Sequence, residues 1–159
     1  MSVENIHKFA EKIGKTKAFI ELQTVGILNE NAKVIEDMNR KQLEHGVGGD
    51  GQKLGDYTYM SKKIRAEHGR QTSFVDLNFE GDFYKSIVAE GYSAGGSPFV
   101  DIEPTDWKWK QKCSGKEGSE ESLQARYPNA IGLDKEHREE VGGIIAKKLS
   151  RLIANFWKI

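Results

Sequence analysis

The sequence predicts an α+β fold, in which a long N-terminal helix and a C-terminal helix pack on a small antiparallel β-sheet. Three observations predict it. Apolar residues recur at three- and four-residue steps before residue 45 and again after residue 134. Between these stretches, two short segments with alternating apolar residues flank a glycine pair. Because 159 residues suffice for one core, we expect a single domain over residues 1–159.

The first 45 residues carry two helical patterns. One covers 2–13, with Ser2 as its N-cap and Gly14 as its end. The other covers 16–45 and would be about 45 Å long at 1.5 Å per residue. That is longer than a domain of this size needs, so part of it would project or pack on neighbours. The alternative is two helices broken near Gly26 or Asn29.

Residues 46–113 are expected to form a turn-rich tip and the sheet. Gly46 ends the long helix, and Asp50-Gly51 is a turn pair. The pattern then predicts a short strand at 53–60, a surface loop or short helix at 61–73, a strand-like run or tight connector at 74–79 and a turn at 81–84. Strands follow at 84–92 and 98–103, joined by a hairpin loop at 93–97. Residues 107–110 are predicted to start a third strand, because both tryptophans would then face one side.

The C-terminal part is predicted to be a loop over 114–133 followed by a helix over 134–157. Within the loop, 114–122 are polar and 123–127 suggest one helical turn. Asp134 is a strong N-cap, and acidic residues come early in the helix while basic residues come later. That order of charges complements the helix dipole.

Composition argues against several classes of protein. The chain has 24 basic and 24 acidic residues, so its net charge of zero disfavours a strongly basic nucleic-acid binder. A single cysteine, Cys113, excludes an intrachain disulfide and a cysteine-rich zinc site. No signal peptide and no membrane span is visible, so we expect a cytoplasmic protein with no membrane partner.

The sequence predicts no catalytic, cofactor-binding or metal-binding residues, and therefore no enzyme. The four histidines share no metal-like spacing. The glycines at 46–51 follow a helix and lack the Gly-Lys-Ser/Thr of a phosphate loop. Asp76 and Asp82 stand at turn-like positions, where aspartate caps backbone donors.

Two candidate interaction surfaces remain. A basic segment could face DNA or a protein partner, although a solvated loop is the simpler interpretation; its residues are Lys62, Lys63, Arg65 and Arg70. The long helix and the sheet margin near 98–110 are expected to carry subunit contacts. The candidate interface residues are Leu28, Ile35, Phe99, Trp107 and Trp109.

Several motifs together resemble those of phage and prophage proteins of the head–tail joining (neck) and tail-completion group. They are Gln42-Leu43 at a helix end, Gly49-Asp50-Gly51 with Leu54-Gly55-Asp56-Tyr57, Val75-Asp76-Leu77 with Gly81 to Ile87, and Ile131-Gly132-Leu133 before the last helix. The resemblance covers roughly residues 30–155. The segments 2–13 and 107–110 do not map onto that group.

The resemblance implies an α+β protomer that forms a ring, often sixfold or twelvefold, between portal and tail. It implies a structural component of the virion, assembled in the host cytoplasm, without enzymatic turnover. Its partners would be portal or adaptor proteins and tail proteins, with possible non-specific contact to packaged DNA. The position in the virion (neck, tail terminator or another ring) stays open. The alternative is a small binding module, encoded by a phage or mobile element, that regulates a host protein and needs no ring.

Overall fold

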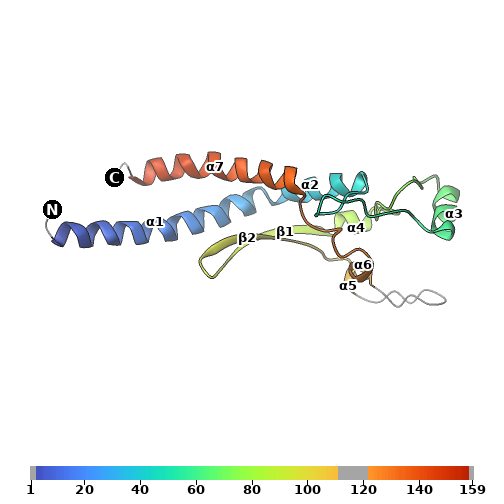
Figure 1. The fold of residues 1–159 in the computed structure, drawn as a ribbon, viewed down its shortest axis with the longest axis horizontal. Helices are drawn as coiled ribbons and strands as arrows, with labels where there is room; N and C mark the ends of the chain where they lie inside the picture. Colours follow the sequence, from blue (N-terminus) through green and yellow to red (C-terminus); the bar gives the residue numbers. More distant parts are fainter. Residues whose placement is uncertain (1–2, 111–121, 158–159) are drawn as a thin grey trace.

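The computed structural model, which describes residues 3–110 and 122–157, is an elongated α+β protein (Figure 1). Helices α1 (Val3–Glu30) and α7 (Lys135–Trp157) lie side by side and antiparallel along one half of the molecule. The strands β1 (Ile87–Ala94) and β2 (Ser97–Pro104) form an antiparallel hairpin beside α1. The predicted fold class, with helices at both ends of the chain and a small antiparallel sheet, is confirmed.

The first predicted helix boundary is wrong, because α1 runs through Gly14 to Glu30 and the break comes at Asn31, before α2 (Ala32–Glu44). A glycine inside a helix costs only about 1 kcal/mol relative to alanine, which the neighbouring helix formers offset. At the break, the side-chain Nδ2 of Asn31 donates to the carbonyl of Ile27 at 2.6 Å. This bond occupies a backbone acceptor and favours a helix end. The alternative of two helices was therefore nearer the structure, with the break two residues beyond Asn29.

The hairpin confirms the two predicted strands, with ends shifted by one to three residues. Gly95 and Gly96 both have positive φ, 61° and 77°, as a two-residue turn requires. On the inner face, Gly91 packs so closely on α1 that an added Cβ would lie 2.7 Å from the Cβ of Leu28. The register therefore requires a glycine at this position.

Helix side chains also bond to the backbone of β1. Asn29 accepts from the Gly91 amide at 2.8 Å and donates to the Gly91 carbonyl at 3.0 Å. Glu36 accepts from the Ala89 amide at 3.3 Å, and Arg40 donates to the Ile87 carbonyl at 2.9 Å. These bonds fix the hairpin against α1 and α2.

Two apolar clusters form the core. One joins the end of α2 to the hairpin base; its buried members are Leu43, Phe83, Tyr84, Ile87, Trp109 and Ala130. The other lies between α1, α2, the hairpin and the start of α7; its buried members are Leu28, Ile35, Met38, Leu133 and Val141. Ile102 packs against both clusters and so links them into one interior.

The segment between α2 and the hairpin contains helices where strands were predicted. Residues 53–60 form no strand: Lys53 makes an isolated bridge with Val47, and α3 (Tyr59–Glu67) begins after the N-cap Thr58. The helical alternative for 61–73 is thus the better one. Residues 74–79 form a connector, and the turn predicted at 81–84 is the short helix α4 (Asp82–Lys85).

The third strand predicted at 107–110 is wrong, because these residues form the short helix α5 (Trp107–Lys110). The Thr105 amide still donates to the Ser86 carbonyl at 2.8 Å, and the chain then turns, because Asp106 Oδ1 accepts from the Lys108 amide at 2.8 Å and starts the helical turn. The helical turn at 123–127 is α6 (Leu123–Arg126). Asp134 caps α7 as predicted, accepting from the His137 amide at 2.9 Å. The predicted polar loop lies, over 114–121, outside the described residues.

Candidate interaction surfaces

Three of the five predicted interface residues are buried inside the protomer. Leu28, Ile35 and Trp109 belong to the two core clusters, so they have no free surface to offer a second subunit. Phe99 and Trp107, in contrast, are 47% and 57% exposed. An apolar stripe on a helix has the same sequence pattern whether it packs on the chain's own hairpin or on a neighbouring subunit. The interface prediction is therefore corrected for the first three residues and stays a prediction for Phe99 and Trp107.

The basic segment is likewise divided by the structure. Arg65 is buried, so its prediction as a DNA- or partner-facing residue is wrong. Lys62 is half-buried and lies 3.6 Å from a carboxylate oxygen of Asp56. Lys63 and Arg70 are exposed. The segment thus offers cations to a partner mainly through Lys63 and Arg70.

Arg65 instead forms a buried ion pair with Asp76. Its Nη2 lies 3.0 and 3.1 Å from the two carboxylate oxygens, and its Nε donates to the Gln71 carbonyl at 2.7 Å. Asp76 also accepts from Tyr57 Oη and Gln71 Nε2, both at 2.7 Å, and from the Asn78 amide at 2.9 Å. These hydrogen bonds satisfy the buried charges, as a stable buried pair requires.

This network fixes α3 on the rest of the molecule. The Arg65 guanidinium lies 4.3 Å from the Tyr57 ring centroid, and Tyr84 Oη donates to the Asp76 carbonyl at 2.7 Å. Burial, together with the bond to Asp76, raises the pKa of Tyr57 to about 12. The adjacent Leu77 has a positive φ of 57°, a strained conformation for a residue with a side chain. Sequence reasoning identified Asp76 as a capping residue but missed its arginine partner, because no short motif connects positions 65 and 76.

The outward side of α3 is mainly apolar, with the cation Lys63 among its apolar residues and the exposed Glu67 one turn further along the helix. Tyr59 and Met60 are 80% and 61% exposed, and Ile64 is also exposed. At 100° per residue, Lys63 projects between Tyr59 and Met60. We call Tyr59, Met60, Lys63 and Ile64 the α3 face. Sequence reasoning weighed the charges of this segment, including Glu67, and missed the exposed apolar residues around Lys63.

The hairpin also presents an apolar surface to solvent. Tyr92 and Phe99 are paired across the strands, stack at 5.8 Å between ring centroids and are 45% and 47% exposed. Glu90 lies directly opposite Asp101 on the same face, and both are exposed. Val88, also exposed, extends the surface towards the hairpin base. We call these five residues the hairpin outer face.

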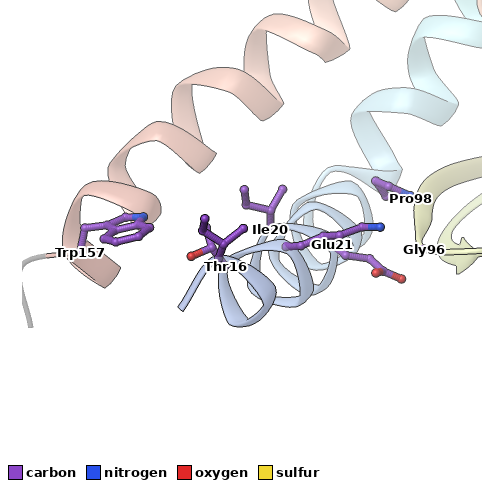
Figure 2. A pocket seen from close by; sticks show the side chains of 8 residues that line it. Thr16, Ile20, Glu21, Gly96, Pro98 and Trp157 are labelled. Atoms are coloured by element: carbon purple, nitrogen blue, oxygen red, sulfur yellow. The ribbon is translucent and has the colours of Figure 1, made fainter. Parts of the chain in front are cut away.

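A groove of about 320 Å³ lies between α1, the hairpin tip and the end of α7 (Figure 2). Figure 2 shows Trp157 at one side, Gly96 and Pro98 at the other, and Thr16, Ile20 and Glu21 of α1 between them. Lys12 covers the Trp157 ring at 4.4 Å from its centroid. The walls are mainly apolar, so the groove adds hydrophobic surface next to the hairpin tip.

A second cleft, also of about 320 Å³, lies between α3 and the region of α5 and α6. Its aromatic wall includes Tyr57, Phe79, Phe83 and Tyr127. Its charged lining combines both signs and includes Arg65, Glu80, Asp82, Asp106, Lys108 and Arg126. Because three acidic and three basic side chains line it, the cleft does not favour a ligand of one charge.

Over residues 3–110 and 122–157, no three His, Cys, Asp or Glu side chains gather into a group that could hold a metal ion. None of the described helices is both long and apolar enough to cross a membrane. Comparison of the chain with protein-family models, with curated proteins and with solved structures found no match.

Proposed function

We propose that this chain is a structural subunit of a tailed phage or prophage virion, a head–tail connector or tail-completion ring protein that joins portal and tail. One observation carries the proposal: an elongated protomer bears two exposed apolar surfaces, the α3 face and the hairpin outer face, at separate places along its length (Figure 1). Surfaces placed apart can each contact a different neighbour. Repeated head-to-tail contacts of this kind form a ring when their rotation closes.

The motifs behind the resemblance to neck proteins support the proposal, because they meet in the structure. The Gly49 amide donates to the Asn129 carbonyl at 2.7 Å, and a Cβ on Gly49 would lie 2.9 Å from Gly132. The Val75 amide donates to the Gly55 carbonyl at 2.9 Å. These turn residues fix how the helices and strands are connected. A motif set shared with the neck-protein group therefore favours a shared protomer fold. The inference to a shared assembly is a proposal by analogy.

The proposed partners are further copies of the chain, a portal or adaptor protein and a tail protein. Lys63 and Arg70 are the cations of the predicted basic segment that are free to face packaged DNA or one of these proteins. Contact with DNA phosphates would be non-specific and would weaken as salt rises. In this role the chain has no substrate and would be found in the virion.

Mass spectrometry of purified particles from a producing strain tests the proposal. We expect the chain to be present in stoichiometric ratio to the portal. Light scattering over a concentration series, with negative-stain imaging, should show growth towards rings of about six or twelve copies. Absence of the chain from intact particles would contradict the proposal. It would favour the alternative, a module that binds a host protein, to be sought by pull-down from the host.

A further inference from the structure

We propose that the α3 face of one copy docks on the hairpin outer face of the next copy, so that Lys63 meets Glu90 and Asp101. The inference rests on the proposed function and deepens it, because it identifies the two surfaces through which neighbouring subunits touch. The occupant of each surface is a second copy of this chain.

The hairpin outer face is locally unfavourable in an isolated protomer. Glu90 and Asp101 are carboxylates placed directly opposite each other, and like charges at such positions destabilise a strand pair. Beside them, Tyr92 and Phe99 leave about half of their surface in water. A cation flanked by apolar groups would relieve both features. Departures from local rules of this kind are expected at functional surfaces.

The α3 face has the complementary composition. Lys63 supplies the cation at its centre, and Tyr59, Met60 and Ile64 supply the apolar surround. Methionine and tyrosine are well suited to protein contacts, since one adapts its shape and the other combines a large apolar ring with a polar end. The match is therefore in charge and in apolar area together, which gives both specificity and affinity.

Both surfaces are held in place before they meet. The Arg65–Asp76 network anchors α3 from its inner side, and Asn29 anchors the hairpin through Gly91. Preorganised partners lose less conformational entropy on binding. In Figure 1, α3 lies at one end of the molecule while the hairpin extends back along α1 towards the other. The two faces of one copy are thus presented to two different neighbours.

Each single contact should be weak. The two faces contribute four and five residues, far fewer than the 20–30 or so per side of a standard stable interface. Association should therefore depend on concentration, and it should become strong only when several contacts close a ring or a portal template gathers the copies.

Charge reversal tests the pairing. Lys63→Glu and Asp101→Lys should each weaken self-association at least tenfold in sedimentation velocity, run with reductant up to millimolar protein. The double variant Lys63→Glu/Asp101→Lys should recover association, because each face of one copy then meets the opposite charge on the next. An equimolar mixture of the two single variants should associate more strongly than either variant alone.

Controls of equal charge change are available on α7, which carries neither face. Lys147→Glu and Glu140→Lys, both at exposed positions, should associate like the wild type. Asp101→Lys should also slightly raise the unfolding midpoint, since it removes the like-charge pair, while it lowers association. A role in folding alone would move both quantities in the same direction. Thermal unfolding of every variant verifies that it is folded.

Three results would overturn the pairing: single variants that associate like the wild type, a double variant no stronger than the single ones, or a wild type that stays monomeric over the whole range. If ring masses persist unchanged in the single variants, the pairing fails while the proposed ring subunit stands. If the variants behave as expected but the chain is absent from particles, the virion function fails while the paired surfaces stand.

Discussion

The body of the molecule and its helical arm are stabilised in different ways. We define the arm as residues 7–23 of α1 with residues 145–157 of α7, and the body as α2, α3, α4, the hairpin and the loops between them (Figure 1). In the body, buried polar side chains bond to the backbone of distant segments. In the arm, two helices contact each other along one seam. The difference separates a part whose geometry is fixed from a part that can adapt.

Helix α2 shows how the body is fixed. Arg40 donates to the carbonyls of Tyr84 and Ile87 at 2.7 and 2.9 Å. Gln42 bonds to both sides of the turn before α7: its Nε2 donates to the Gly132 carbonyl at 3.2 Å, and its Oε1 accepts from the Asp134 amide at 3.1 Å. Directional bonds of this kind specify one arrangement of the loops.

The arm relies on aromatic contacts near the chain ends. Phe19 and Phe156 stack at 4.5 Å between ring centroids. Next to the arm, a groove of about 290 Å³ lies between α1 and α7, where Gly26 has no side chain to fill the space. The exposed ion pair between Lys148 and Glu30, at 3.0 Å, lies at this groove. Exposed ion pairs contribute only about 0–1 kcal/mol. The arm should therefore open at lower free energy than the body.

The largest expected effect is in the body. Arg65→Ala leaves the Asp76 carboxylate buried without its cation, so we expect a loss of about 3–5 kcal/mol in the free energy of unfolding. Urea denaturation measures it. Arg70→Ala, at an exposed position in the same segment, should change stability by less than about 0.5 kcal/mol. Equal losses in the two variants would contradict the structural role assigned to Arg65.

Two glycine substitutions contrast the body with the arm. Gly91→Ala forces a methyl group against Leu28 and should cost about 1–3 kcal/mol. Gly14→Ala, where an added Cβ meets no atom within 4 Å, should instead stabilise the protein by about 0.5–1 kcal/mol through helix propensity. Thermal unfolding compares both variants. A shift of the same sign in the two would contradict the close approach of hairpin and helix.

Phe156→Ala should loosen the arm and leave the body unchanged. Because Phe156 is only half-buried, we expect a loss of about 1–2 kcal/mol, below the cost of a core phenylalanine. Hydrogen exchange should speed up at amides in residues 7–23 and 145–157 and stay constant in α2 and β1. Faster exchange throughout would show that arm and body unfold as one unit.

Tyr57→Phe has the smallest effect at neutral pH, a loss of about 0.5–1.5 kcal/mol for one hydrogen bond. The contribution of Tyr57 to stability is easier to detect at alkaline pH. With a folded-state pKa near 12 against about 10 when unfolded, the folded protein keeps the phenol proton that the unfolded chain loses. Stability is therefore fully present below pH 10 and falls as pH rises towards 12.

The phenylalanine variant should flatten part of this decline in a series of urea denaturations at rising pH. Tyr84, whose pKa burial also raises, accounts for a remaining slope. An unchanged pH profile in the variant would contradict the buried contact between Tyr57 and Asp76.

The parts of the fold that can be predicted are those determined by interactions between residues close together in the sequence. Asp134 caps α7 because the bond reaches only three residues ahead, and Gly95-Gly96 sets the hairpin because both positions need positive φ. Local chemistry suffices for both. The helix break at Asn31 is less predictable, because it involves an asparagine side chain that bonds back to the Ile27 carbonyl and no glycine or proline marks it.

The candidate surfaces were less predictable, because burial depends on contacts between distant residues. Leu28 and Trp109 were apolar enough for either a core or an interface, and the hairpin and α4 decide for the core. Arg65 appeared as one more cation in a basic segment until the fold brought Asp76 to it. Phe99 and Trp107 are exposed, and their use in an interface stays a prediction.

The bonds from helix side chains to β1 have a consequence for behaviour at high concentration. A two-stranded sheet has two open edges that can recruit a strand from another chain and start aggregation. Asn29 and Glu36 occupy the edge of β1. On β2, the register directs the backbone of positions 98, 100, 102 and 104 outward, and Pro98 and Pro104 have no N–H to share. At high protein concentration, copies of the chain should therefore contact one another through side chains and should not aggregate by adding strands to the sheet.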